Sequence, residues 1–136
     1  MNSPQDDGLV RLASPYSFEQ TVERLQSLIQ SQGLTLFCIV DHSGAAAKAG
    51  LKMPPTQVLL FGSPKAGTPL MIAAPTLAID LPLKALIAED DNGKVWVTYN
   101  STEYLKHRHG IPDELAKNIA GVATLLHKLV QSEGKA

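Results

Sequence analysis

The hydrophobic positions along the chain change between strand-like and helix-like spacing. Short apolar runs at residues 8–14 and 57–62, and a longer run at 34–42, are typical of strands. Residues 17–33 instead carry apolar side chains at helical spacing. Ser17 with Gln20 forms a capping box at the start of this segment, and Gly33 is placed as its C-terminal cap. Because the run 34–42 is almost continuously hydrophobic, it predicts a strand that is buried on both faces.

The second half of the chain predicts a β-hairpin and a long helix. The arms of the hairpin are expected at about 83–89 and 94–99, joined by an Asn-Gly turn at 91–93. After Pro112, apolar residues recur at helical spacing nearly to the end of the chain, which predicts a long amphipathic C-terminal helix.

Three shorter helices are also expected. One follows the central apolar run at 43–50, and another spans 68–75 with Thr68 as its N-cap. A third begins at a capping pair made by Asn100 and Glu103.

The order of elements is therefore β-α-β-(α)-β-(α)-β-β-α-α. Two long helices with a run of strands, at least one pair of which is antiparallel, predict an α+β fold with both helices on one face of a largely antiparallel sheet. We expect residues 1–15 to form a tail and the first strand, residues 16–132 a single α+β domain, and residues 133–136 a C-terminal tail.

Composition narrows the function classes. Twelve basic and 13 acidic residues give a net charge of −1, which argues against a general nucleic-acid binder because such proteins need a basic excess. The polar, acidic N-terminus has no apolar core of a signal peptide, and no apolar stretch is long enough to span a bilayer. These features predict a soluble cytoplasmic protein without a membrane partner. The spacing of His and Cys residues predicts no metal site, and no cofactor is expected.

Several local patterns together resemble a known family. They are Asp41-His42, the break Pro54-Pro55-Thr56, the pair Phe61-Gly62 followed by Pro64, and the run Asp80-Leu81-Pro82-Leu83-Lys84. The chain is similar, over about residues 16–130, to the domain of unknown function 302 family of small prokaryotic proteins. Ser63 stands where that family commonly has Asn. The resemblance implies a compact fold similar to half of the TATA-binding protein, usually in a homodimer, and it implies no reaction.

The segment Gly62-Ser63-Pro64-Lys65-Ala66-Gly67-Thr68 is the first candidate site. Two glycines separated by four residues are reminiscent of a phosphate-binding loop, but Thr68 stands where such a loop carries its Lys, and prolines remove backbone donors. Two interpretations remain: a simple strand-to-helix connection, or a site for a small anion at a helix N-terminus, with Gly62, Ser63, Lys65 and Thr68 around it.

Asp41, His42, Asp80 and Lys84 are the other candidates. Asp41 or Ser43 can cap the short helix, whereas His42 titrates near neutral pH and can serve acid-base chemistry. Apolar neighbours suggest that Asp80 is partly buried, so it needs a partner, for which Lys84 and His42 are suitable types. We predict that Asp41, His42, Gly62, Asp80 and Lys84 converge at one end of the sheet.

Three functions follow as hypotheses. The first is a non-enzymatic homodimeric module that binds a small anionic or polar ligand or a partner. The second is an enzyme or sensor that uses His42, Asp80 and Lys84 as acid-base groups, and the third is a structural or assembly protein. Cys38 is interpreted as inert core, and the segment around His107 and His109 as a basic helix C-terminus. The apolar run 34–42 supports the homodimer, because a second subunit would cover it.

Overall fold

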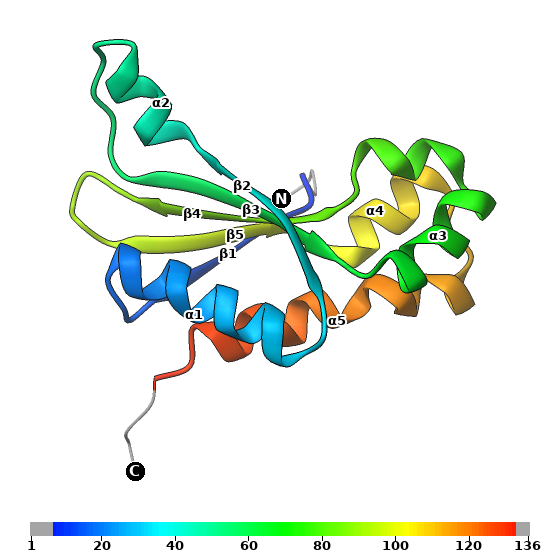
Figure 1. Ribbon diagram of the computed structural model, residues 1–136. Helices are drawn as coiled ribbons and strands as arrows, with labels where there is room; N and C mark the ends of the chain where they lie inside the picture. The colour runs from blue at the N-terminus through cyan, green and yellow to red at the C-terminus, as the bar shows by residue number, and fades with distance from the viewer. Residues whose placement is uncertain (1–6, 133–136) are drawn as a thin grey trace, which may run out of the picture.

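A computed structural model describes residues 7–132 of the chain. Five strands form one antiparallel sheet in the spatial order β1-β5-β4-β3-β2, and two long helices cover one of its faces (Figure 1). This architecture confirms the predicted α+β class and the predicted order of elements. The elements are β1 (Leu9–Ser14), α1 (Phe18–Ser31), β2 (Thr35–Asp41), α2 (His42–Lys48), β3 (Thr56–Gly62), α3 (Pro64–Ala73), the 3-10 helix η1 (Pro75–Ile79), β4 (Leu83–Glu89), β5 (Val95–Asn100), α4 (Thr102–His109) and α5 (Asp113–Leu129).

The N-terminus of α1 forms as the sequence predicts. The Ser17 hydroxyl accepts a hydrogen bond from the Gln20 backbone N–H at 3.1 Å, and the Gln20 side chain accepts one from the Ser17 N–H at 3.2 Å. Gly33 follows the helix with a positive φ of 73°, which a residue without Cβ adopts at little cost. Residues 1–6, which belong to the tail and first strand predicted at 1–15, and the tail predicted at 133–136 lie outside the described residues, whereas β1 pairs with β5 along its whole length.

The strand register sorts the side chains onto two faces, because residues paired directly across an antiparallel sheet point to the same side. Leu59, Ile87 and Val97 lie on the face that packs against α1 and α5, and each is fully buried. The opposite face, here called the open face, carries three rows of paired residues. They are Val40, Val58, Leu86, Thr98 and Arg11; Thr56, Ala88, Trp96 and Ala13; and Cys38, Leu60 and Lys84.

The prediction that residues 34–42 are buried on both faces is wrong for the single chain. β2 is an edge strand with one neighbour, and Phe37, Ile39 and Val40 are 48%, 36% and 40% exposed. Cys38, interpreted as inert core, is also exposed. In addition, the register shifts between Leu36 and Cys38, so a bulge interrupts the strict alternation expected for this strand.

The helix expected at 68–75 begins earlier. Ser63 is its N-cap, Pro64 takes the first helical position, and Thr68 lies inside α3. The start of α4 differs from the prediction by only one residue: Ser101 rather than Asn100 is the N-cap, and its hydroxyl accepts the Tyr104 N–H at 3.1 Å. In both cases a serine directly before the helix supplies the accepting hydroxyl, so a local hydrogen bond sets the boundary.

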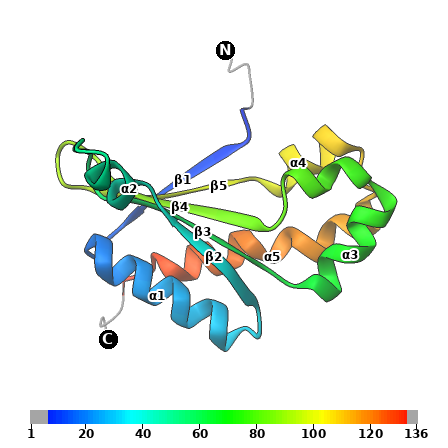
Figure 2. The same ribbon diagram turned by 45° about the horizontal axis from the view of Figure 1, so that its top comes forward.

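A second apolar cluster lies beyond the end of the sheet. The first half of α5 leaves the sheet and packs with α3, η1 and α4, as Figures 1 and 2 both show. Leu70, Leu77 and Leu105 are buried in this cluster, and Leu83 of β4 packs against both this cluster and the main core. At the opposite end of the sheet, α2 projects from β2 (Figure 1).

Candidate functional site

The predicted site residues lie at two opposite ends of the sheet. Asp41 pairs with Gln57 at one end of β3, and Gly62 pairs with Thr35 at the other. Five residues along a strand cover about 16 Å. Asp80 lies at the same end of β3 as Gly62. It comes three residues before Leu83, and Leu83 pairs with Phe61. The predicted convergence of all five residues is therefore wrong for Asp41 and His42.

At the first end, Asp41 caps α2, as one of the two interpretations expected. Its Oδ1 accepts the Gly44 N–H at 2.9 Å and the Ser43 hydroxyl at 3.2 Å, while the Ser43 Oγ accepts the Thr56 N–H at 3.0 Å. These contacts fasten α2 to the start of β3. His42 is the first residue of the helix and is exposed.

The glycine-containing segment forms no phosphate-binding loop. From Pro64 onward its backbone is helical, and the first free N–H groups of α3 are partly satisfied by Ser63, whose Oγ accepts the Ala66 N–H at 3.3 Å. Lys65 is exposed on the first turn. The predicted helix start at Thr68 does not exist, so an anion site there loses its basis.

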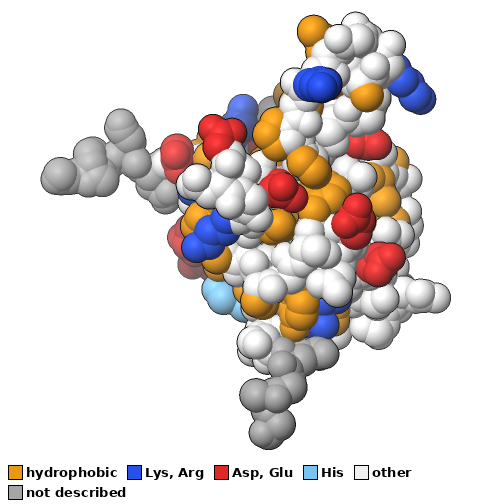
Figure 3. All heavy atoms as spheres, turned by 90° about the vertical axis from the view of Figure 1, so that its left-hand side faces the viewer, with side chains coloured by type: hydrophobic (Ala, Val, Ile, Leu, Met, Phe, Trp, Pro, Cys, Tyr) orange, Lys and Arg blue, Asp and Glu red, His pale blue; other side chains and the backbone are white. Residues whose placement is uncertain are grey.

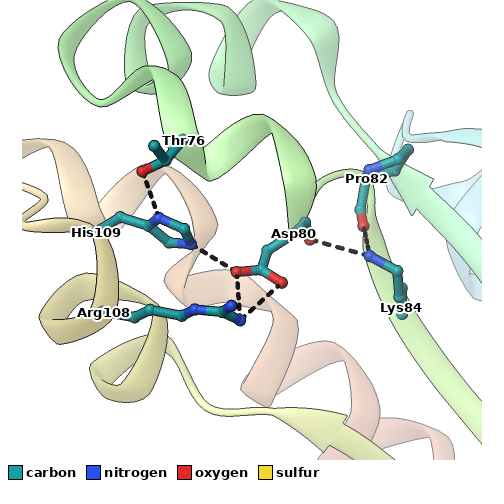
Figure 4. A network of polar contacts seen from close by, with 6 residues as sticks. All are labelled: Thr76, Asp80, Pro82, Lys84, Arg108 and His109. Atoms are coloured by element: carbon teal, nitrogen blue, oxygen red, sulfur yellow. Dashed lines mark hydrogen bonds and ion pairs between the residues drawn. The ribbon is translucent and has the colours of Figure 1, made fainter.

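Asp80 is the centre of a polar network (Figure 4). Its Oδ2 lies 2.5 Å from His109 Nε2 and 3.2 Å from Arg108 Nη1, and His109 Nδ1 lies 2.8 Å from the Thr76 hydroxyl. The His109 side chain is 4% exposed and the Asp80 side chain 15%. Partial burial of Asp80 is thus confirmed, and its carboxyl group, which contacts the His109 imidazole and the Arg108 guanidinium, joins the end of η1 to α4.

The partners predicted for this carboxylate are wrong. Lys84 reaches the same region, but its Nζ donates to the backbone carbonyls of Asp80 and Pro82 at 3.2 and 3.3 Å. His42 lies at the other end of the sheet. The true partner, His109, is 29 residues away in the sequence, and no local pattern links it to Asp80.

A cavity of about 730 Å³ lies between the end of β3, α3, the segment 81–83 and α5. Its walls include the buried Phe61, Ile119, Val122 and Leu125. This volume is within the range of small-molecule sites, roughly 300–1,000 Å³. Of the predicted ligand-binding residues, Gly62, Ser63 and Thr68 line the cavity, whereas the side chains of Asp41, His42, Lys65 and Asp80 do not.

The polar groups of the cavity are few. Asn118 donates to the Ala66 carbonyl at 3.0 Å and so ties α5 to α3. Gln32, Thr68, Thr124 and Lys128 are exposed at the rim. Within the part of the chain that the structure describes, Lys128 is the one charged side chain around the cavity. An apolar interior with polar groups at its mouth suits a ligand that has an apolar body and a polar end.

Three residues with shifted pKa values lie away from this cavity. The hydrogen bond with Asp113 raises the pKa of Lys106, burial raises the pKa of the Tyr99 phenol, and the Trp96 indole N–H and neighbouring backbone N–H groups lower the pKa of Asp90. The shifts at Lys106 and Asp90 come from a helix contact and a hairpin turn, so structural hydrogen bonding explains them.

Among residues 7–132, no cluster of three or more His, Cys, Asp or Glu side chains has the arrangement of a metal site. The helices described there are too short or too polar to cross a membrane.

Comparisons with known proteins place the chain in a family. The Domain of unknown function DUF302 family matches residues 10–130. The chain is also 43% identical over 111 residues to "Fluoride-specific ion channel FluC 1" of Brucella suis biovar 1 (strain 1330), covering 82% of this chain and 44% of that protein. A protein of the same name from Brucella abortus biovar 1 (strain 9-941) gives 43% identity and 41% coverage. The chain thus spans less than half the length of the curated relatives it matches.

A solved structure shows the same fold. The crystal structure of an uncharacterized conserved protein DUF302 from Bacillus stearothermophilus superposes with a TM-score of 0.76. The superposition covers 92% of this chain and 97% of that chain at 14% identity. At this identity the likeness concerns the fold alone. The match over residues 10–130 confirms the resemblance seen in the sequence, and the chain belongs to the Domain of unknown function DUF302 family.

Proposed function

We propose that this protein is a non-enzymatic module that binds a small molecule in the cavity between α3 and α5 and that works as a homodimer. The observation that carries the proposal is the cavity itself. It has a volume of about 730 Å³, is lined by residues of β3, α3 and α5, and is partly open to solvent. A preformed apolar cavity of this size with a few polar groups at its mouth is the usual form of a small-molecule site.

Filling the cavity tests this function. Gly121 of α5 lines the cavity, and a Cβ placed on it meets no atom within 4 Å, so Gly121→Leu can project into the space. We expect the affinity for a neutral fluorescent probe such as N-phenyl-naphthylamine to fall by roughly tenfold, about 1.4 kcal/mol. Removing a helical glycine also stabilises the helix by up to about 1 kcal/mol, so unfolding would not cause the loss.

Ala120→Leu is the matched control, because it adds a side chain to an exposed neighbouring position of α5 that does not line the cavity. Its probe affinity is expected to equal that of the unmodified protein. Equal affinity in both variants and the unmodified protein, or no probe binding at all, would reject a ligand site in this cavity.

The open face of the sheet supports the homodimer. Its rows are mainly apolar, with Val58, Leu60 and Leu86 half-buried and Val40 exposed in the single chain. Figure 3 views the end with α2, where hydrophobic side chains lie at the base of the projecting part with Asp and Glu side chains between them, and the projecting part carries Lys or Arg and further hydrophobic side chains. Apolar side chains exposed on a sheet face are costly in water, and a second copy would remove them from solvent.

Light scattering on a size-exclusion column tests the assembly. The chain has a mass of 14.6 kDa, so the dimer is expected at twice this value. Leu86→Glu, which places a charge in the middle of the open face, is expected to give the monomer mass. Ile72→Glu changes a side chain that is 76% exposed on α3 and should leave the dimer intact. A monomer mass for the unmodified protein at micromolar concentration would reject the homodimer.

The geometry does not favour the enzyme hypothesis built on His42, Asp80 and Lys84. His42 lies at the opposite end of β3 from Asp80, and Lys84 binds backbone carbonyls. The hydroxyl, imidazole and carboxylate of Thr76, His109 and Asp80 do form a chain of contacts, but none of them lines the cavity. General acid-base catalysis requires the reacting group within hydrogen-bond reach, about 3 Å.

A further inference from the structure

We propose that the ligand is an amphiphilic monocarboxylate, with an acyl chain or similar apolar body inside the cavity and its carboxylate at Lys128. This inference rests on the proposed function, because it names the class of molecule that the cavity between α3 and α5 binds. It is carried by the division of the cavity into an apolar interior and a mouth with one positive charge.

The interior selects an apolar body. Phe61, Ile119, Val122 and Leu125 are buried walls with no side-chain hydrogen-bonding group. The Asn118 amide also lines the cavity, and one of its N–H groups donates to the Ala66 carbonyl. A polar group placed among these walls would lose its hydrogen bonds to water without replacement, whereas each methylene gains from burial.

The mouth selects a negative charge. Lys128 is the single charged side chain that lines the cavity among residues 7–132, and it forms no ion pair with a carboxylate in that range. Lys106 and Arg108, in contrast, are paired with aspartates. The ammonium group of Lys128 therefore has capacity for an external anion, and one positive charge matches one carboxylate.

Uncharged donors at the rim complete the head-group site. The Gln32 side chain and the Thr124 hydroxyl line the cavity and are exposed, and neither makes a side-chain hydrogen bond within the described chain. An amide N–H and a hydroxyl can both donate to carboxylate oxygens. Thr124 lies four residues before Lys128 on α5, so the two side chains are neighbours on the helix surface.

The length of the cavity sets the size of the ligand. The lining residues of α5 run from Asn118 to Lys128. Ten residues of α-helix extend about 15 Å, which accommodates a medium-length acyl chain with its head group at the Lys128 end. An apolar interior with its charged group at one end also disfavours compact polar metabolites.

A series of head groups on one chain length tests the class. Decanoate, decanol and decylamine are titrated below their micelle-forming concentrations, with affinity measured by displacement of N-phenyl-naphthylamine and by calorimetry. We expect decanoate to bind about two- to fivefold more tightly than decanol, since Lys128 is exposed and its charge is screened by water. Decylamine should bind most weakly. Extending octanoate to decanoate should tighten binding by about fourfold per methylene.

Lys128→Met removes the charge but keeps an aliphatic stem, and it is expected to abolish the preference for decanoate over decanol. Lys117→Met, an exposed lysine of the same helix that does not line the cavity, should keep the preference. Circular dichroism of both variants checks that the fold is intact. A preference for decanol or decylamine, or a decanoate preference that survives in Lys128→Met, would overturn the monocarboxylate.

The probe and the head-group series separate binding in the cavity from the preference for a carboxylate. If none of the three compounds binds and Gly121→Leu has no effect on the probe, the cavity is not a ligand site and both proposals fall. If Gly121→Leu blocks binding but decanol binds as well as decanoate, the cavity binds small molecules and only the carboxylate assignment is wrong.

Discussion

Replacing Asp80 by Ala should destabilise the protein strongly for a single polar substitution. The change leaves the His109 Nε2, on a side chain that is 4% exposed, without its partner at 2.5 Å. A buried polar group that loses its partner costs about 1–3 kcal/mol. The contact with Arg108 adds little, because Arg108 is 49% exposed and such pairs contribute up to about 1 kcal/mol. We therefore expect the free energy of unfolding to fall by about 2–3 kcal/mol in Asp80→Ala.

Chemical denaturation followed by circular dichroism measures this loss, and the thermal midpoint should fall by roughly 8 °C for 2 kcal/mol in a domain of this size. Asp91→Ala serves as the control, because Asp91 is exposed in the hairpin turn. A double-mutant cycle with His109→Ala should give a coupling of about 1–2 kcal/mol. A loss below about 0.5 kcal/mol for Asp80→Ala, or additive effects in the cycle, would refute the assigned role of the pair.

Three further substitutions test local structure. The Asp90 carboxylate accepts the Trp96 Nε1–H at 3.0 Å. This bond and two backbone N–H groups lower the pKa of the Asp90 carboxyl from 3.8. The stabilisation that Asp90 gives the folded protein is therefore present above pH 3.8 and is lost as the pH falls through the lowered pKa. The difference in urea midpoint between the protein and Asp90→Asn should accordingly hold near neutral pH and shrink below about 3.8. Ser17→Ala, which breaks the capping box, should cost about 1 kcal/mol in urea denaturation. Gly110→Ala, at a φ of 67°, should lower the thermal midpoint through about 1 kcal/mol of backbone strain, and an unchanged midpoint would contradict this reading.

Local patterns in the sequence predict the elements because helix caps, tight turns and the spacing of apolar positions involve residues only a few positions apart. The capping box at Ser17 and the arms of the hairpin at 83–89 follow from side chains within a few positions. The prediction for β2 fails for a different reason. A continuous apolar run is common to a central strand and to an edge strand whose exposed side faces a partner, and the sequence of one chain does not distinguish them.

The candidate site was only partly predictable because its contacts are long-range. Gly62 and Ser63 do lie at the cavity, since strand ends on a rigid sheet are where a site can form. The apolar neighbours of Asp80 predict its burial, but its partner His109 comes from α4, which the chain reaches only after the hairpin. The helical period of α5 indicates its buried side, yet the same period gives no sign that Gly121 and Thr124 would border an empty space.

The position of the cavity follows from the packing of α5 into two separate apolar clusters. Its C-terminal half, with Leu126 and Leu129, packs under the sheet, and its N-terminal half, with Ala116 and Ile119, packs against α3 and α4. The two clusters meet along α5 between these two halves. The cavity lies at that junction, and its walls come from both clusters.

The Asp80 network holds the segment that leads into Leu81 at this junction, so loosening it in Asp80→Ala should weaken probe binding as well as stability. Probe affinity that stays unchanged in a folded Asp80→Ala protein would show that the cavity walls are fixed by apolar packing alone.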